Sequence, residues 1–263
     1  MLIKIENLSY AYNGTPVLRD ISVSIDKGER WAILGKNGAG KSTLLKCIGR
    51  LIEIPHNKIS IRNKKLEEYS SINLAHILSY VPQASNRSVP PFSVYDFVMM
   101  GRFPYQGFMA TPSPADRAIV TESLELTDTT QLADRLMPSL SGGELQRVFL
   151  AGAVAQRTDV ILLDEPITFL DPLHQEMVRQ CLNRIHSQFG TTFITVTHDI
   201  NAALSNSSHV LAILNGTVNF SGPIQKFLEE CPGILKDIYS IEFESVEIDS
   251  GIGKIMISLE IQK

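Results

Sequence analysis

A glycine-rich segment near the start of the sequence constrains the fold of this chain more than any other feature. Residues 35–42 read GKNGAGKS and satisfy the pattern G-x-x-x-x-G-K-[ST]. They follow the short apolar run 31–34, typical of a strand buried on both faces, and they precede residues 42–48, whose spacing suits a helix. A strand, a tight turn and a helix in this order predict an α/β fold with a parallel core sheet.

The same segment has the chemistry of a phosphate-binding loop. Its glycines allow successive backbone N–H groups to curl around phosphate oxygens, and the N-terminal end of the following helix favours anions. We expect Lys41 to neutralise the terminal phosphates and Ser42 to coordinate Mg²⁺. The pattern alone also fits an ordinary glycine-rich turn, so nucleotide binding is a hypothesis that the other segments must support.

Two carboxylates end a second apolar run. Residues 160–163 lead directly into Asp164 and Glu165, and ligands of parallel sheets bind at the carboxyl ends of the strands. We expect Asp164 to hold Mg²⁺, directly or through water. Glu165 is the candidate general base for the water that attacks a γ-phosphate. The alternative is a solvated strand end before Pro166.

A third segment, LSGGELQR at residues 140–147, places a glycine pair at the start of an apolar-periodic pattern that runs to about residue 155. It predicts a second helix N-terminus suited to phosphate. A protein with one bound nucleotide needs only one such loop. The sequence therefore raises the question of whose phosphate this segment contacts.

Together these segments resemble the ABC-type ATPases, because residues 140–147 are similar to the signature motif that separates this family from other P-loop enzymes. The resemblance implies ATP and Mg²⁺ as cofactors and a head-to-tail dimer, in which the signature segment of one copy closes on the γ-phosphate held by the other. Hydrolysis would remove contacts that favour the closed dimer. The implied ATP-binding residues are Tyr12, Gly35, Lys36, Asn37, Gly38, Ala39, Gly40, Lys41, Ser42 and Thr43, and those binding in trans are Ser141, Gly142, Gly143 and Glu144.

Four further positions match the family in order and spacing. Tyr12 matches the aromatic residue that stacks on adenine, and His198 matches the γ-phosphate sensor. Gln83 matches the glutamine that links Mg²⁺ to the transporter contact, and Asp171 matches the aspartate across the dimer interface. Ile167 departs from the family, which usually has a small hydroxyl residue there. The implied catalytic residues are Glu165, His198 and Gln83, and the implied Mg²⁺ ligands are Ser42, Gln83 and Asp164.

The resemblance covers nearly the whole chain and implies the ABC ATPase fold, with a RecA-like core sheet, an N-terminal antiparallel β subdomain and an inserted helical subdomain. Period-2 alternation at residues 2–6 and 21–25 favours antiparallel strands, and Asn215-Gly216 indicates a hairpin turn. Prolines separate short helical patterns after residue 84. We expect an ATPase domain at 1–240, with its core at 1–83 and 159–240, a helical subdomain at 84–158 and a β extension at 241–263.

Composition limits the partners and the compartment. A formal net charge of −4 and a pI near 5.9 argue against broad binding to nucleic acid or anionic lipid. No apolar run approaches the roughly 18 residues of a membrane-spanning helix, so we expect a cytoplasmic protein, peripheral on the inner face of the membrane through partner subunits. Cys47, Cys181 and Cys231 lack metal-ligand spacing and are expected to be reduced, partly buried thiols.

Residues 93–107 and 171–175 are similar to ATPases of importers for ferric siderophores, haem and cobalamin. This resemblance implies integral-membrane permease subunits as partners and, indirectly, a substrate-binding protein. Apolar groups beside Gln83, with Phe103 and Tyr105, are the candidate groove for a permease coupling helix, although a surface turn with a packed aromatic is the alternative. Zinc or manganese importers and a soluble ATPase of iron–sulfur cluster assembly remain alternatives, and the cargo itself is not encoded in these motifs.

Overall fold

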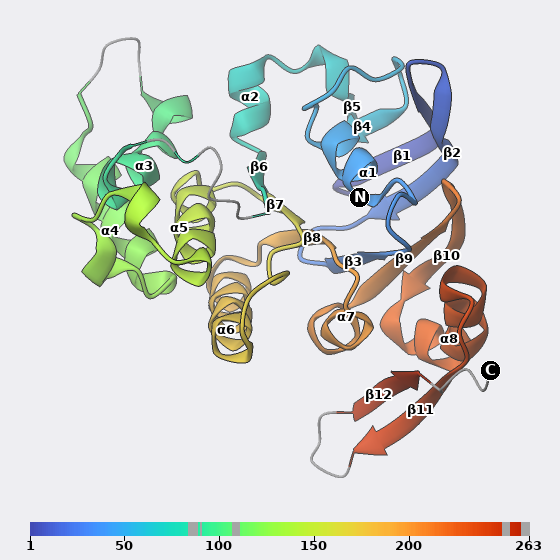
Figure 1. Cartoon of the computed structure of the whole chain (residues 1–263). Helices are drawn as coiled ribbons and strands as arrows, with labels where there is room; N and C mark the ends of the chain where they lie inside the picture. The colour runs from blue at the N-terminus through green and yellow to red at the C-terminus, as the bar shows by residue number, and fades with distance from the viewer. Residues whose placement is uncertain (84–88, 90, 107–110, 249–252, 259–263) are drawn as a thin grey trace. The chain divides into compact units, whose positions relative to one another are not determined.

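The computed structural model of the chain describes residues 1–83, 89, 91–106, 111–248 and 253–258 (Figure 1). The chain packs into two compact units. The first comprises Met1–Glu68 and Phe193–Lys263, and the second comprises Tyr69–Thr192. The helical insertion expected at residues 84–158 falls inside the second unit.

The first unit begins with an antiparallel sheet in the strand order β2-β1-β4-β5. It is built from β1 (Ile3–Tyr12), β2 (Thr15–Ile25), β4 (Ile59–Ile61) and β5 (Lys64–Lys65), followed by the short 3₁₀ turn η1 (Leu66–Glu68). Ile3 lies opposite Ile25 on one side and opposite Ile61 on the other, and all three are buried. The alternation of apolar and polar residues therefore gives the sheet one buried face, as the sequence predicts.

A parallel sheet segment forms the centre of the first unit, in the order β10-β9-β3-β8. Strand β3 (Arg30–Leu34) pairs in parallel with β8 (Thr192–Val196) and with β9 (His209–Leu214). The Asn215-Gly216 turn joins β9 to the antiparallel β10 (Thr217–Pro223), which confirms the expected hairpin. The four interior residues 31–34 are buried, as expected for a strand covered on both faces.

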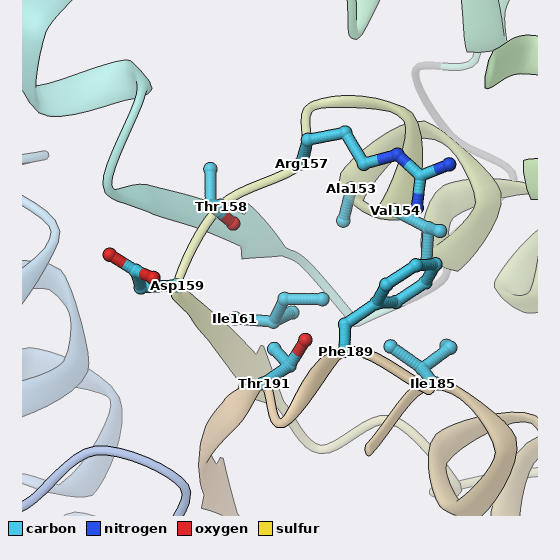
Figure 2. A pocket seen from close by; sticks show the side chains of 9 residues that line it. All are labelled: Ala153, Val154, Arg157, Thr158, Asp159, Ile161, Ile185, Phe189 and Thr191. Atoms are coloured by element: carbon cyan, nitrogen blue, oxygen red, sulfur yellow. The ribbon is translucent and has the colours of Figure 1, made fainter. Parts of the chain in front are cut away.

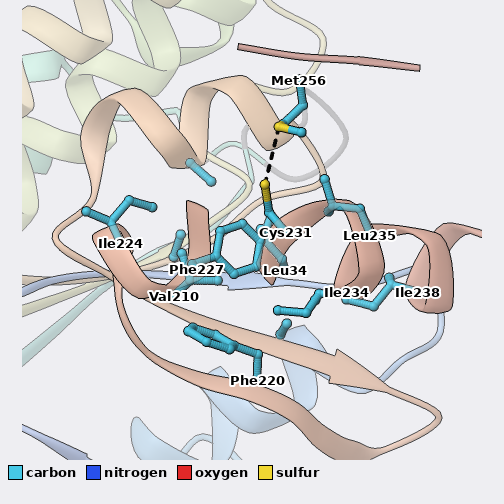
Figure 3. Packing of buried hydrophobic residues seen from close by; sticks show 13 residues of the cluster. Leu34, Val210, Phe220, Ile224, Phe227, Cys231, Ile234, Leu235, Ile238 and Met256 are labelled. Atoms are coloured by element: carbon cyan, nitrogen blue, oxygen red, sulfur yellow. Dashed lines mark hydrogen bonds between the residues drawn. The ribbon is translucent and has the colours of Figure 1, made fainter. Parts of the chain in front are cut away.

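Helices α7 (Ile200–Asn206) and α8 (Ile224–Tyr239) of the first unit pack against this sheet around a core that includes the C-terminal segment (Figure 3). Helix α1 (Lys41–Ile48) follows β3 in the same unit. The β extension is a hairpin of β11 (Phe243–Ile248) and β12 (Gly253–Ser258), and residues 249–252 and 259–263 lie outside the described part of the chain. Met256 from β12 reaches the core, where its sulfur lies 3.4 Å from the Cys231 sulfur of α8.

The second unit contains the parallel strand pair β6 (Leu78–Val81) and β7 (Val160–Asp164) and most of the helices. Its helices are α2 (Ser71–Ala75), α3 (Val94–Met100), α4 (Pro114–Leu126), α5 (Gly142–Ala155) and α6 (Pro172–Phe189), with 3₁₀ turns η3 (Phe103–Tyr105), η4 (Thr130–Leu132) and η5 (Met137–Ser139). A separate apolar core joins α3, α4 and α5 through Val98, Val120 and Val148.

The helix starts of the second unit follow local sequence signals. Ser93, Ser113, Ser141 and Asp171 cap α3, α4, α5 and α6, and each side chain accepts a hydrogen bond from a backbone N–H of the first turn. Proline opens α4 and α6, where its missing N–H has no cost. These caps explain where α3 and α4 begin, among the short helical patterns that the sequence indicates after residue 84.

Two further expectations concern burial. The described part of the chain contains no helix whose length and apolar content would carry it through a bilayer. Cys47, Cys181 and Cys231 are free thiols and are buried, as expected. Burial raises the pKa of the Cys47 thiol to about 12, so this group stays protonated and unreactive at neutral pH.

Candidate functional site

The glycine-rich segment folds as a turn between β3 and α1 in the first unit (Figure 1). The Lys41 ammonium is buried, and it donates hydrogen bonds of 2.8 Å and 3.0 Å to the carbonyl oxygens of Gly35 and Lys36. Helix α1 begins at Lys41, and the first N–H groups of any helix lack intrahelical acceptors. The loop therefore combines a fixed cation with a helix N-terminus, which is the geometry of an anion site.

Gly40 cannot be replaced without disturbing this loop. It caps α1 with φ of +100°, a backbone conformation that other residues rarely adopt. A Cβ atom at this position would lie 2.7 Å from Cδ2 of Leu18 and 3.0 Å from the carbonyl oxygen of Val17. The glycine thus lets β2 approach the start of α1 closely.

His198 lies beyond the neighbouring strand at the same edge of the sheet. Ile33 of β3 is in register with Val196 of β8, and the Thr197 N–H donates a 3.2 Å hydrogen bond to the Ile33 carbonyl. The loop after β3 and the segment after β8 therefore leave the sheet side by side. His198 is exposed there, so the structure brings it to the same strand edge as the glycine-rich turn, and its sensor role stays a prediction.

Tyr12 ends β1 in the first unit. Its ring meets the Tyr10 ring edge to face, with centroids 4.9 Å apart, and 42% of the residue is exposed. An exposed aromatic face supported from one side is suited to stack on a planar group. Its contact with adenine remains a prediction.

The carboxylates of the second unit lie at the carboxyl ends of β6 and β7. Asp164 is buried at the end of β7, and its Oδ2 accepts a 3.0 Å hydrogen bond from the hydroxyl of Tyr80 on β6. Burial first, and the neighbouring Asp164 carboxylate next, raise the pKa of Tyr80, so this hydroxyl keeps its proton and remains a donor. The pair fixes the orientation of the Asp164 carboxylate.

Gln83 and Glu165 also meet at this edge. Val81 lies opposite Leu163 in the parallel pair, and two residues further the Gln83 amide Nε2 is 3.4 Å from Oε2 of Glu165. Glu165 has φ of +50°, in the left-handed region. Such a backbone costs a non-glycine residue about 1–2 kcal/mol and is typical of functional positions. The structure thus brings Gln83 to Glu165, the residue after Asp164, at the ends of the paired strands β6 and β7, and the catalytic roles of these residues stay predictions.

The oxygen donors proposed for Mg²⁺ suit this ion. Ser42 offers a hydroxyl, Asp164 a carboxylate and Gln83 an amide oxygen, and Mg²⁺ prefers such hard ligands together with substrate phosphates. Over the residues that the structure describes, no group of three or more His, Cys, Asp or Glu side chains is arranged to hold a metal ion. By chemistry alone each of these oxygen donors suits Mg²⁺, and its binding stays a prediction.

The signature segment forms the first turn of α5. The Ser141 hydroxyl accepts from the Glu144 N–H at 3.3 Å, and the Glu144 carboxylate accepts from the Ser141 N–H at 2.8 Å, which makes a reciprocal capping box. The hydrogen bond that the Ser141 N–H donates to the Glu144 carboxylate is the largest cause that lowers the pKa of Glu144, and Arg135 lies 3.2 Å from its Oε1. Gly142 is exposed and Gly143 is buried. Binding of a second copy's nucleotide by this turn remains a prediction.

Asp171 caps α6 and is exposed at the surface of the second unit. Its Oδ1 accepts from the His174 N–H at 2.9 Å, and its Oδ2 lies 2.7 Å from Nδ1 of the same histidine. The backbone and side-chain hydrogen bonds from His174 lower the pKa of Asp171. Phe169, two residues earlier, is 92% exposed. The residue is accessible to a partner, and the dimer contact expected of Asp171 stays a prediction.

The structure adds two positions that contact proposed site residues and that the sequence does not single out. Tyr80 is one, because one tyrosine in an apolar strand carries no pattern of its own. His174 is the other, and the resemblance of residues 171–175 to importer ATPases gives it no role. A cap residue followed three positions later by a polar residue, as in Asp171-Pro172-Leu173-His174, is the signal that would have drawn attention to it.

A small pocket in the second unit lies away from these residues (Figure 2). It opens beside Thr158 and Asp159, just before β7, which is the opposite end of the strand from Asp164. The Arg157 guanidinium lies 4.3 Å above the centre of the Phe189 ring and pairs with Glu122. Because ligands of parallel sheets bind at the carboxyl ends of strands, we do not assign this pocket to the nucleotide.

Strand, glycine-rich turn, helix N-terminus and paired carboxylates define a P-loop nucleotide-binding protein of the α/β class. Comparison with known proteins gives the family, because the family model described as ABC transporter matches residues 18–168. The chain belongs to the ABC transporter family, and it is an ATP-binding subunit that hydrolyses ATP.

Curated relatives span nearly the same length. The iron(3+)-hydroxamate import ATP-binding protein of Bacillus subtilis (strain 168) is 34% identical over 92% of this chain and 88% of its own length. The petrobactin import ATP-binding protein of the same organism is 34% identical over 95% of this chain and 97% of its own length. The achromobactin transport ATP-binding protein of Dickeya dadantii (strain 3937) is 34% identical over 89% and 86%.

Solved structures confirm the fold class. A metal-chelate type ABC transporter in an inward-facing conformation contains a chain that is 26% identical, with a TM-score of 0.84 over 99% of this chain and 98% of that chain. A dimeric ATP-binding cassette in a post-hydrolysis state, bound to ADP and Pi, is 26% identical, with a TM-score of 0.73 over 85% of this chain and 99% of that chain. The expected ABC ATPase fold, with its β-rich start and inserted helices, is therefore correct.

Proposed function

We propose that this chain is the ATPase of an importer for metal chelates, with ferric siderophores as the first candidate cargo. The observation that carries the proposal is that relatives with iron-hydroxamate, petrobactin and achromobactin in their names resemble the chain over most of its length. A metal-chelate type transporter has the same fold across the whole chain. The ATPase itself does not meet the cargo, so this part of the proposal rests on likeness.

The proposed chemistry assigns separate tasks to the residues described above. Lys41 and the N–H groups at the start of α1 hold the β- and γ-phosphates, with Ser42 as a ligand of Mg²⁺. Bound Mg²⁺ would neutralise charge that develops on the phosphates. Glu165 accepts the proton of the attacking water, and Gln83 orients its carboxylate through the contact at 3.4 Å. His198 stabilises the γ-phosphate from the end of β8.

The proposed assembly is a head-to-tail dimer of this chain on membrane permease subunits at the cytoplasmic face. In that dimer, Ser141, Gly142 and Gly143 of one copy complete the nucleotide site of the other. The accessible position of Asp171 and the 92% exposure of Phe169 support a protein contact at the segment before α6. ATP then shifts the population toward the closed dimer, and hydrolysis releases it.

The permease contact is proposed at exposed apolar side chains of the second unit, which we call the apolar patch: Ile72, Met100, Phe103 and Tyr105. Phe103 is 75% exposed, and Tyr105 is held beneath the turn by stacking on His76, with ring centroids 4.4 Å apart. The Tyr105 hydroxyl donates a 2.9 Å hydrogen bond to the Gln156 carbonyl. A rigid aromatic beside an exposed one is suited to receive an apolar helix face.

Other cargoes are alternatives within the same class. Haem and cobalamin importers have similar ATPases, and a zinc or manganese importer or a soluble ATPase of iron–sulfur cluster assembly would share the nucleotide chemistry. Uptake by a strain that lacks the gene distinguishes them. Loss of ferric siderophore uptake, restored by the wild-type gene, supports the proposal, whereas loss of zinc or manganese uptake alone refutes the cargo class.

A glutamine in place of Glu165 tests the chemistry and the assembly together. Glu165→Gln removes the proton acceptor but keeps the size and polarity of the side chain, so ATP binding should stay within about twofold while turnover falls by about a hundredfold or more. The variant should form dimers in gel filtration with ATP and remain monomeric with ADP. Turnover near that of the wild type would refute the role of Glu165, and ATP-loaded monomers would refute the dimer.

A further inference from the structure

The signature turn of α5 rests directly on a side chain of α6 in the same protomer. Gly143 is buried, and a Cβ atom built on it would lie 2.8 Å from Cβ of His174 and still closer to two ring carbons. Real carbon atoms do not approach one another so closely, so this position accepts only glycine while His174 is present. At the adjacent Gly142 a Cβ atom would meet nothing within 4 Å. Packing against His174 therefore excludes a side chain at Gly143, whereas no such contact excludes one at Gly142.

The histidine that supports Gly143 is itself fixed from the other side. Its backbone N–H donates a 2.9 Å hydrogen bond to Oδ1 of Asp171, and its Nδ1 lies 2.7 Å from Oδ2 of the same carboxylate. Because an ionised carboxylate only accepts hydrogen bonds, the proton of the imidazole lies on Nδ1. The His174 side chain is 26% exposed, against 58% for that of Asp171. The ring is thus clamped between an exposed cap residue and a buried glycine.

A second contact between α5 and α6 lies one turn further along both helices and opposes rotation of one helix against the other. The Arg147 guanidinium lies 3.5 Å from the Met177 sulfur, and Arg147 is buried. Gly143 with His174, and Arg147 with Met177, therefore join successive turns of α5 and α6. The first turn of α5 cannot shift along α6 without losing both contacts.

We propose that His174 is a positioning residue that couples the Asp171 cap to the signature turn, so that the two segments face a second copy of this chain with one fixed geometry. The inference rests on the proposed function, because it concerns surfaces that act only in the ATP-dependent dimer. His174 need not touch nucleotide for this role. It fixes where the N–H groups at the start of α5 lie relative to Asp171, and such N–H groups are the phosphate ligands proposed in trans. A displacement of about 1 Å at a reacting phosphate is enough to reduce turnover by about a hundredfold.

The decisive variants change the ring and keep the nucleotide-binding residues of the first unit. His174→Ala should leave the Kd of the monomer for ATP within about twofold, lower kcat by about tenfold or more, and weaken the ATP-dependent dimer in the Glu165→Gln background by a similar factor. His174→Asn retains a Cγ atom against Gly143 and an amide N–H for Asp171, and it should restore most of kcat. A histidine that only stabilised the fold would instead lower ATP affinity, kcat and Tm together.

A double-variant cycle tests the contact itself. Gly143→Ala should lower Tm strongly because its methyl group overlaps His174. The pair Gly143→Ala with His174→Gly should regain part of that loss, since the glycine removes the Cβ and ring atoms that collide. His174→Gly alone lowers the helix propensity at this position, and its Tm provides the baseline.

The outcomes separate this inference from the proposed function. If Glu165→Gln fails to dimerise with ATP, the proposed dimer is refuted. The kcat of His174→Asn and the double-variant cycle still test the contact between His174 and Gly143. Wild-type kcat and dimer stability in His174→Ala would overturn the inference. So would additive losses in the cycle, or an His174→Asn variant as impaired as His174→Ala. If His174→Ala does not fold, the comparison of His174→Asn with wild type decides.

Discussion

The hydroxyl of Tyr80 donates a 3.0 Å hydrogen bond to Oδ2 of Asp164, across the adjacent strands β6 and β7. The partners are separated by 84 residues in the sequence and meet because the two strands pair in parallel. Groups that orient a metal-binding carboxylate commonly affect metal affinity. The relationship therefore makes Tyr80 the support of the proposed Mg²⁺ ligand.

Removing this hydroxyl should weaken Mg²⁺ binding without removing the ligand. A hydrogen bond to a charged group contributes about 1.5–3 kcal/mol, so Tyr80→Phe should raise the Mg²⁺ concentration for half-maximal ATPase activity by roughly 10- to 150-fold. A titration with MgCl₂ at saturating ATP measures the shift. Tyr95→Phe, in the helical core of the same unit, is the matched control and should leave the titration unchanged. Equal midpoints for Tyr80→Phe and wild type would show that the hydrogen bond does not matter.

The apolar patch should be dispensable for the isolated subunit. Phe103 is 75% exposed, so Phe103→Ala should leave ATPase activity and stability of the free chain within experimental error. Together with Tyr105→Ala it should weaken co-purification with the permease, because the apolar side chains proposed for the contact are gone. Leu51→Ala, which truncates an exposed leucine in the first unit, is the control. Undiminished assembly of the double variant would exclude this surface.

A buried ion pair should hold the helical part of the second unit together. The Arg102 Nε donates a 2.9 Å hydrogen bond to Oδ1 of Asp116, and Arg102 also donates to the Ala155 carbonyl at 2.8 Å. Asp116→Ala leaves the guanidinium buried without its carboxylate and should cost about 3 kcal/mol of unfolding free energy. Urea denaturation measures the loss. The exposed pair of Arg179 and Glu176 offers a contrast, since Glu176→Ala should cost about 0.5 kcal/mol or less.

The same carboxylate gives this stability a pH dependence. Hydrogen bonds from Ser113 first, and from Arg102 next, lower the pKa of Asp116 in the folded chain. Because the pKa of Asp116 is lower in the folded chain, its ionised carboxylate stabilises the fold fully above the unfolded pKa, about 3.9. This stabilisation is lost as the pH falls through the pKa of Asp116 in the folded chain. The difference in stability between wild type and Asp116→Ala should therefore be constant from pH 7 to pH 5 and shrink below pH 4. A difference that grows on acidification would contradict the assignment.

The C-terminal hairpin should protect a thiol of the first unit (Figure 3). Asn201 of α7 bonds to both backbone groups of Met256, at 2.9 Å and 3.2 Å, and the Met256 side chain covers Cys231. Met256→Ala should cost about 2 kcal/mol and speed the alkylation of Cys231. Peptide mapping after brief exposure to a thiol reagent measures this. Cys181, buried in the second unit, should react as slowly as in the wild type, and equal rates for Cys231 would refute the packing.

The sequence by itself determined the local chemistry of this protein. The spacing of Gly35, Gly40 and Lys41 specifies a loop whose hydrogen bonds close within six residues, and the apolar run before Asp164 specifies a strand end. The serine caps and the Asn215-Gly216 turn are local for the same reason. These features depend on backbone preferences and on hydrogen bonds between near neighbours, which a short pattern fully contains.

Only the tertiary structure decided which distant side chains support that chemistry. Strand register brings Tyr80 to Asp164 and Gln83 to Glu165. Helix packing places Gly143 against His174. A tyrosine, a glutamine or a histidine can serve many roles, and its sequence neighbours do not specify its partner. The physical reason is that side-chain contacts between elements depend on how every layer of the core fills its space, and this is a property of the whole packed unit.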